Sequence, residues 1–154
     1  MDIQLRDVTA DDIPIIYEQQ SDPEAIHMAA FVPARTKDAH AAHWAKILRD
    51  DTGISKTIVF EGQVAGFLVK FEMFNEPEVG YWLGKAFWGK GIATRALALF
   101  LPFIAVRPLF AHAAKDNLAS LRVLQKCGFV IQGYDRAHAD ARGEEIDEAI
   151  LKLA

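Results

Sequence analysis

The chain has 154 residues, the length of one ordinary domain, and 51% of them are apolar, among them ten Phe and three Trp, so a sizeable core can be buried. The formal net charge is −4, from 17 Lys and Arg against 21 Asp and Glu, which excludes the basic excess typical of a nucleic-acid binder. Cys127 is the only cysteine, so no intramolecular disulfide can form.

No segment predicts a secretory leader or a membrane span. Residues 1–7 carry acidic side chains and lack the apolar core of a signal peptide. The longest apolar run, Ala96 to Val106, is too short to cross a bilayer and contains Pro102. We therefore expect a cytoplasmic protein whose partners include neither a membrane nor a nucleic acid.

The N-terminal third predicts one strand and two main helices. Near-alternation of apolar residues over positions 3–8 favours a strand, and Thr9 stands where an N-cap belongs, ahead of a helix through about Gln20. Residues 21–35 are typical of a loop with a short helix. Thr36 is expected to cap a helix over about residues 37–50. The expected buried positions of that helix are Ala39, Ala42, Trp44, Ile47 and Leu48.

The apolar period then changes to that of β-strands. Residues 54–60 and 64–74 predict two strands joined by the short connection 61–63, and residues 78–83 predict a third strand. The remaining expected elements are a helix from about Gly89, a strand at 109–114, a helix over 117–127 that ends at Gly128, and strands at 129–134 and 146–153. Together these elements predict a single mixed α+β domain over residues 1–154.

The most informative segment joins the strand at residues 78–83 to the next helix through a turn with Gly89 and Gly91. Backbone N–H groups at a helix start lack internal acceptors and lie at the positive end of the helix dipole. Glycines let a ligand approach this backbone closely, so the turn suits a phosphate or pyrophosphate, with Lys90 as an added cation. The P-loop pattern is incomplete, because Gly91 follows Lys90 where that pattern needs a Ser or Thr, and Thr94 stands where a dinucleotide fingerprint has its third glycine.

Two segments resemble the signatures of the GNAT N-acetyltransferase superfamily. Residues 88–93, Trp-Gly-Lys-Gly-Ile-Ala, resemble its acyl-CoA signature, and residues 117–129 resemble its second signature, with Asn117, Ser120 and Lys126 in place. The resemblance covers nearly the whole chain and is strongest to the ribosomal-protein N-terminal acetyltransferases, whose strand before the turn often reads Gly-Tyr-Trp-Leu, as at residues 80–83. It implies the GNAT fold, with a mixed central sheet that is splayed at the cofactor site and flanked by helices.

The resemblance also implies acetyl-CoA as cosubstrate without a metal, and direct attack of a primary amine on the thioester. The pyrophosphate is expected at the backbone of residues 89–94, and the pantetheine arm along the strand end, where a bulge would splay this strand from residues 109–114. The implied cofactor-binding residues are Trp82, Leu83, Gly84, Trp88, Gly89, Lys90, Gly91, Ile92, Ala93, Thr94 and Asn117.

Two departures from the family pattern bear on catalysis. Trp88 replaces the Arg or Gln of the first signature, and Leu124 stands where many relatives have a Tyr that protonates the departing CoA thiolate. We therefore expect Ser120 to be the thiolate acid, directly or through water, with a solvated hydroxyl as the alternative. Asn117 could likewise be only an N-cap, and Cys127 is interpreted as a core residue rather than a nucleophile.

The amine must lose a proton before it attacks, and Glu78 is the expected catalytic base, with a carboxylate at the rim of a strand as the alternative. Glu72 and His112 are the reserves for this role. His40 and His43 lie three residues apart on a helix, a spacing that could hold a metal. No third ligand is visible in the sequence, so we interpret them as part of a helix face.

The predicted activity is transfer of an acetyl group from acetyl-CoA to a primary amine, which is either a small molecule or a protein N-terminus. An alternative is a non-catalytic acyl-CoA sensor on the same fold, which the missing Tyr at position 124 favours and Ser120 and Glu78 disfavour. Acceptor specificity is expected to lie in residues 21–36 and in the loop before Glu78. The sequence is also compatible with a homodimer.

Overall fold

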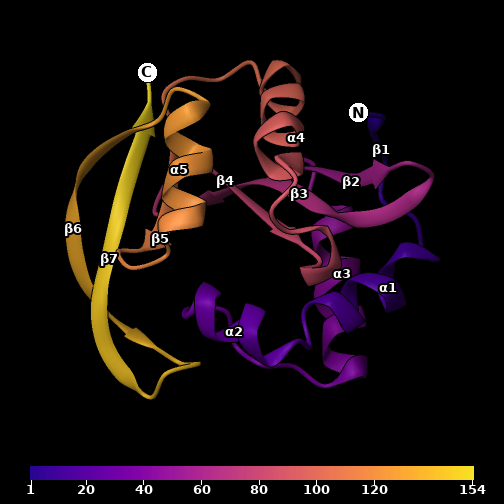
Figure 1. The fold of residues 1–154 in the computed structure, drawn as a ribbon, viewed down its shortest axis with the longest axis horizontal. Coiled ribbons are helices and arrows are strands. Elements are labelled where there is room, and N and C mark those ends of the chain that lie inside the picture. The colour runs from indigo at the N-terminus through magenta and orange to yellow at the C-terminus, as the bar shows by residue number, and fades with distance from the viewer.

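The computed structural model describes residues 1–154, and a seven-stranded mixed sheet forms its centre (Figure 1). Its strands are β1 (Ile3–Arg6), β2 (Ile54–Phe60), β3 (Gln63–Met73), β4 (Glu76–Leu83), β5 (Leu109–Ala114), β6 (Val130–Ala139) and β7 (Glu144–Leu153). Its α-helices are α1 (Asp12–Gln19), α2 (Pro23–Ala29), α3 (Lys37–Arg49), α4 (Ile92–Phe100) and α5 (Leu118–Lys126). Two short 3₁₀ helices, η1 (Lys85–Phe87) and η2 (Leu101–Phe103), lie before and after α4.

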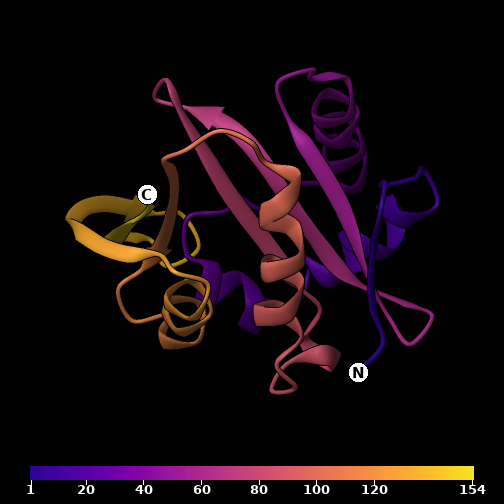
Figure 2. The same cartoon turned by 90° about the horizontal axis from the view of Figure 1, so that it is seen from above.

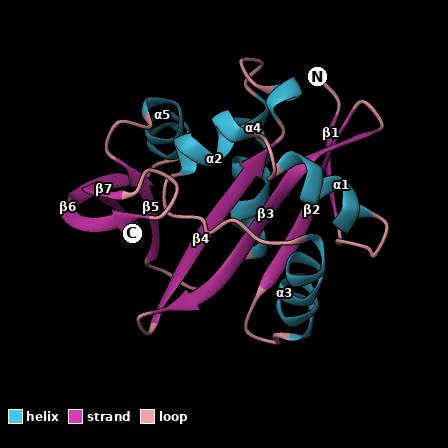
Figure 3. Cartoon of the chain, turned by 90° about the horizontal axis from the view of Figure 1, so that it is seen from below, coloured by secondary structure: helices cyan, strands magenta, loops and turns pink.

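The sheet is splayed between β4 and β5, as the resemblance implied. The strand order is β1-β2-β3-β4-β5-β7-β6, and every neighbouring pair is antiparallel except β4 and β5. These two strands run parallel and share a single pair, Glu78 with Phe110. Figure 3 shows β5, β6 and β7 turned away from the sheet that β1 to β4 form. The gap beside the end of β4 is therefore a break in the hydrogen-bonded sheet.

The expected bulge in β4 is absent. Its pairing with β3 keeps one register from Gly66 opposite Leu83 to Met73 opposite Glu76. The splay therefore comes from the divergence of β5, and β4 itself stays regular.

Each face of the sheet is covered by its own set of helices. Helices α4 and α5 pack on one face over the main core, which includes Leu97, Phe100 and Phe129. Helices α1 and α3 pack on the other face, where Trp44 and Trp82 belong to a smaller core. Figure 2 shows α4 crossing in front of the strands, with the N-terminal helices behind them. None of the helices combines the length and the apolar character needed to cross a membrane.

The start of α1 differs from the expected Thr9 cap. The helix begins at Asp12, and the Thr9 side chain caps nothing; instead the Thr9 backbone N–H donates to Asp12 Oδ2 at 2.9 Å. The buried Asp12 carboxylate also accepts from Arg6 at 2.7 and 2.9 Å and from Thr57 Oγ1 at 2.8 Å. These donors stabilise the charged form and hold the pKa of Asp12 well below its usual range, the Arg6 hydrogen bond being the largest cause.

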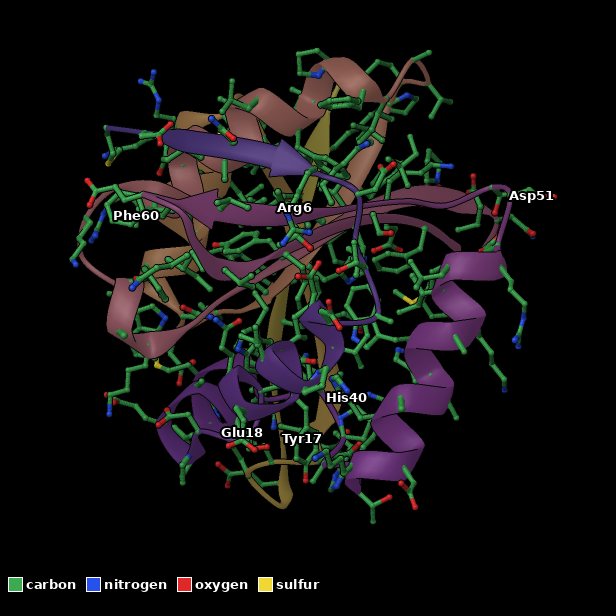
Figure 4. All side chains as sticks on the ribbon, turned by 90° about the vertical axis from the view of Figure 1, so that its right-hand side faces the viewer. Arg6, Tyr17, Glu18, His40, Asp51 and Phe60 are labelled. Carbon is green, nitrogen blue, oxygen red and sulfur yellow. The ribbon has the colours of Figure 1, made fainter.

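Helix α3 confirms the Thr36 cap, whose side chain accepts from the Ala39 N–H at 3.1 Å. Trp44 is buried as expected, but Ala39, Ala42 and Leu48 are exposed, and His40 is buried in their place. His40 is 4% exposed, its ring packs edge-on against that of Tyr17 at 5.3 Å, and its Nε2 lies 2.8 Å from Gln20 Oε1 (Figure 4). Gln20, the C-cap residue of α1, thus supplies a partner for Nε2, whereas Nδ1 is buried without a hydrogen-bond partner.

Three strands are longer than expected. Strand β4 begins at Glu76, because Phe74 and Asn75 both have positive φ, of 54° and 61°, and so form a two-residue hairpin turn. Strands β6 and β7 pair from Val130 opposite Lys152 to Ala139 opposite Glu144 and form one long hairpin. Charged residues in β6 and β7 interrupt the alternation of apolar and polar residues, so the sequence did not predict the full length of these strands.

Candidate active site

A cavity of about 440 Å³ opens where β4 ends, between α2, α4 and α5. Helices α4 and α5 stand side by side above the end of β4 in Figure 1. Eleven of the eighteen lining residues are hydrophobic. The lining residues that the sequence predicted as functional are Trp82, Leu83, Trp88, Gly89, Gly91, Ile92, Ala93, Thr94, Asn117 and Ser120. Gly84, Lys90 and Glu78 were predicted as well and do not line this cavity.

The turn before α4 presents an unusual run of free hydrogen-bond donors. None of the six backbone N–H groups from Gly89 to Thr94 has an acceptor in the protein; the first intrahelical bond is from the Arg95 N–H to Gly91 O at 3.3 Å. Gly89 and Gly91 have φ of 76° and 77°, which an L side chain rarely adopts. Convergent N–H groups at the positive end of a helix dipole form an anion site, so the structure fits a pyrophosphate here.

Two cations on α5 add to this site, and sequence reasoning missed both as functional residues. Arg122 and Lys126 are one helical turn apart and line the same cavity. Their i, i+4 spacing within the second signature is the signal that could have identified them. Lys90 instead lies outside the cavity, with its Nζ 5.8 Å from the centre of the Phe60 ring.

The open edge of β4 includes Leu83, as expected, but its other member is Tyr81 and not Trp82 or Gly84. The Gly84 N–H donates to Ala65 O on β3 at 2.8 Å. Because backbone groups alternate in direction along an antiparallel strand, Trp82 and Gly84 turn theirs to β3, while Tyr81 and Leu83 turn theirs to the gap. An extended ligand chain could therefore pair with Tyr81 and Leu83.

Trp88 closes one end of this edge. Its indole N–H donates to Leu83 O at 2.8 Å, and its ring lines the cavity. The replacement of the family's Arg or Gln by Trp thus retains a donor and adds an apolar wall.

Asn117 connects the two helices on either side of the cavity. Its Oδ1 accepts from the Ser120 N–H at 3.2 Å and so caps α5, and its Nδ2 donates to Met28 O of α2 at 3.3 Å. Asn117 therefore caps α5, and its tie to α2 could not be seen in the sequence because it spans 89 residues.

Ser120 meets Tyr81 inside the cavity. The Tyr81 hydroxyl donates to Ser120 Oγ at 3.1 Å, and both residues line the cavity. Burial is the main cause that raises the pKa of Tyr81 to about 12, so the phenol keeps its proton at neutral pH.

Glu78 is buried beside His112 on the opposite face of β4 from Tyr81. Glu78 Oε1 lies 3.2 Å from His112 Nε2, and Glu148 Oε1 of β7 lies 3.3 Å from His112 Nδ1. Hydrogen bonds to Glu148 and Glu78, in that order, raise the pKa of His112 to about 10. The imidazole is therefore charged at neutral pH and is a poor base there, which argues against His112 in that role.

The other candidate base and the histidine pair lie away from the cavity. Glu72 forms an ion pair with Lys70 at 2.9 Å and does not line the cavity. His40 and His43 both have a lowered pKa, chiefly because of burial. No group of three or more His, Cys, Asp or Glu side chains is placed to hold a metal ion.

Comparison with known proteins agrees with this geometry. Residues 2–130 match the Acetyltransferase (GNAT) domain family. The uncharacterized N-acetyltransferase p20 of Bacillus licheniformis is 25% identical over 98% of this chain and 92% of its own length. YdaF of Bacillus subtilis, assigned provisionally as a ribosomal N-acetyltransferase, is 29% identical over 60% of this chain and 55% of its own length.

Among solved structures, the spermidine N-acetyltransferase of Vibrio cholerae in complex with CoA and spermine superposes with a TM-score of 0.86. The two chains share 16% identity, and the match covers 98% of this chain and 94% of the other. At this identity the likeness concerns the fold alone.

Proposed function

This chain belongs to the GNAT acetyltransferase family, and from that premise we propose that it transfers an acetyl group from acetyl-CoA to a primary amine by direct attack. The observation that carries the proposal is the run of six free N–H groups from Gly89 to Thr94 at the edge of a cavity that reaches the β4 edge. Acetyl-CoA supplies the acyl group as a thioester, and this chain's residues bind and orient it.

The proposed cofactor site follows the length of the cavity. The N–H groups from Gly89 to Thr94 hold the pyrophosphate, and Arg122 and Lys126 contribute positive charge at the same opening. The backbone edges of Tyr81 and Leu83 pair with the pantetheine arm. This arrangement directs the thioester into the gap between β4 and β5.

The acceptor is proposed to reach the same gap from the other face of the sheet. Glu78 has the same parity along β4 as Trp82, which packs with α1 and α3, whereas Tyr81 faces α4 and α5. An amine approaching from the side of the N-terminal helices therefore meets a carboxylate before it meets the thioester. Because Glu78 is 2% exposed and does not line the cavity, we place a water between it and the amine.

The acceptor class is proposed to be a protein N-terminus or a small-molecule amine. An α-amine, with an unperturbed pKa of about 7.7–8.0, needs only a modest base, whereas an alkyl ε-amine with a pKa of about 10.4 needs more assistance. The relatives support both kinds, since one is named for spermidine and one for a ribosomal protein.

The test is the release of free CoA thiol from acetyl-CoA in the presence of a panel of amines, with the acetylated product identified by mass spectrometry. The panel should hold polyamines, amino acids and peptides with free and blocked N-termini. Thiol release that depends on one class of free amine is the expected result. Tight CoA binding with no release for any amine would indicate an acyl-CoA sensor instead.

A further inference from the structure

Position 124, where many relatives have the Tyr that protonates the departing thiolate, is occupied by a buried Leu in this chain. Leu124 is 2% exposed and belongs to the main core under α5. Ser120 lies one helical turn earlier on the same face of α5 and lines the cavity. Ser120 alone would therefore have to do, with a short side chain, what the longer Tyr side chain at the position of Leu124 does in those relatives.

Tyr81 supplies a phenol to this place from the opposite wall. Its ring packs against the main core on the face of the sheet that carries α5, and its hydroxyl donates to Ser120 Oγ at 3.1 Å. Ser120 donates no hydrogen bond to any protein group, and its backbone N–H is used by Asn117. With one oxygen lone pair occupied by Tyr81, the Ser120 proton is free to point into the cavity.

We propose that Tyr81 is a positioning residue for thiolate departure: its hydroxyl holds Ser120 Oγ so that the Ser120 O–H points at the leaving sulfur. The inference rests on the proposed function. In the transfer, the acyl carbon bonds to the amine nitrogen and the carbon–sulfur bond breaks, leaving its electron pair on sulfur. The Ser120 O–H donates a hydrogen bond to that sulfur and keeps its proton, so CoA leaves as the thiolate. The proton that the amine nitrogen loses passes through water to Glu78, and the thiolate takes a proton from solvent after it departs.

Hydrogen bonds in a chain strengthen one another. The bond that Ser120 accepts from Tyr81 therefore makes the Ser120 O–H a stronger donor to the sulfur. Stabilisation of a charged sulfur by such a donor lowers the pKa of the thiol. The arrangement therefore makes a prediction for bound CoA that does not require turnover.

The experiment measures the pKa of the CoA thiol in its complex with the protein, from the ultraviolet absorbance of the thiolate during a pH titration. Ser120→Ala should raise this pKa by roughly one unit, since hydrogen bonds to charged groups have that magnitude. Tyr81→Phe should raise it less, and the double variant should match Ser120→Ala because Tyr81 acts through Ser120. Tyr134→Phe, in a half-exposed tyrosine of β6, is the matched control and should leave it unchanged.

Turnover at saturating acetyl-CoA should fall in the same order, with KM for acetyl-CoA retained. A thiol pKa in Tyr81→Phe equal to that of the wild type, or additive effects in the double variant, would overturn the role of Tyr81 while leaving the proposed function intact. If the thiol pKa values follow the expected order but the wild-type protein releases no thiol with any amine, the proposed function is refuted and the role of Tyr81 is not.

Discussion

Glu78 Oε1 lies 3.2 Å from Nε2 of His112, and the other ring nitrogen of that histidine lies 3.3 Å from Glu148 Oε1. The Glu78 side chain is 2% exposed, whereas those of His112 and Glu148 are 20% and 17% exposed, so Glu78 is the most deeply buried of the three. Both nitrogens of the charged ring therefore face a carboxylate oxygen, one from β4 and one from β7.

The first prediction concerns Glu78 as the base. Glu78→Gln keeps the shape and removes the charge, so turnover should fall about 10²–10⁴-fold, the usual contribution of a general base. CoA affinity should hold, because Glu78 lies outside the cavity lining. The measurements are kcat across pH and the dissociation constant of CoA.

Glu72→Gln is the control for this variant, since Glu72 is 43% exposed and pairs with Lys70 away from the cavity. It should retain full turnover. A Glu78→Gln variant that stays within a factor of two of the wild type at every pH would assign proton removal to bulk water.

The second prediction concerns stability and pH. The pKa of His112 is raised from 6.5 to about 10 on folding, so the ion pairs contribute stability that is fully present below pH 6.5 and is lost as pH rises toward 10. His112→Gln should therefore lower the free energy of unfolding by about 1–3 kcal/mol at low pH, after allowance for partial exposure. The difference from the wild type should shrink as pH approaches 10.

Urea unfolding at pH values below 6.5, between 6.5 and 10, and above 10 measures this difference. His138→Gln is the control, because His138 is 59% exposed and its nearest carboxylate, in Asp140, lies 3.7 Å away. It should change stability little at any pH. A pH-independent loss in His112→Gln would mean that the ring contributes by packing and not by charge.

The third prediction concerns the turn before α4. Gly91→Val places a β-branched residue at a φ of 77°, which should distort the N–H groups and weaken CoA binding at least tenfold, or about 1.4 kcal/mol. Calorimetry with and without EDTA measures it, and chelation should change nothing.

Backbone strain alone requires a separate control. Gly143 in the β6–β7 turn also has a positive φ, of 66°, and a Cβ on either glycine would meet no atom within 4 Å. Gly143→Val should therefore show a similar loss of stability with normal CoA affinity. Equal affinity of folded Gly91→Val and wild-type protein for CoA would disprove the phosphate turn.

Local features of the sequence predicted much of the fold and several of the residues that line the cavity. Gly89, Gly91 and the Asn117 cap act within a few residues of themselves, and the structure places all three at the cavity. The Thr9 cap was wrong because Arg6 and Thr57, the latter far away in sequence, bind Asp12 and fix the start of α1 elsewhere.

The catalytic side of the site depends on contacts between distant segments. In the sequence Tyr81 is an ordinary strand residue, because its hydrogen-bond partner Ser120 is 39 positions away on α5. Glu148 joins the cluster only because β7 pairs with β5, so that His112 and Ile150 are opposite each other. Register and sheet order decide such contacts, and neither is encoded within one element.

The last prediction separates Ser120 from Cys127. The Cys127 thiol donates to Thr94 O at 3.4 Å and so joins the end of α5 to the first turn of α4, and burial raises the pKa of the thiol, which favours its unreactive form. Cys127→Ala should therefore cost roughly 1 kcal/mol of stability, the scale of one hydrogen bond, and leave turnover near that of the wild type. Ser120→Ala should lower turnover with little loss of stability. Turnover and melting temperature of both variants test this, and mass spectrometry of the wild type with acetyl-CoA alone should find no acetyl group on Cys127. An acetylated Cys127 that passes its acetyl group to the amine would replace direct attack with a two-step mechanism.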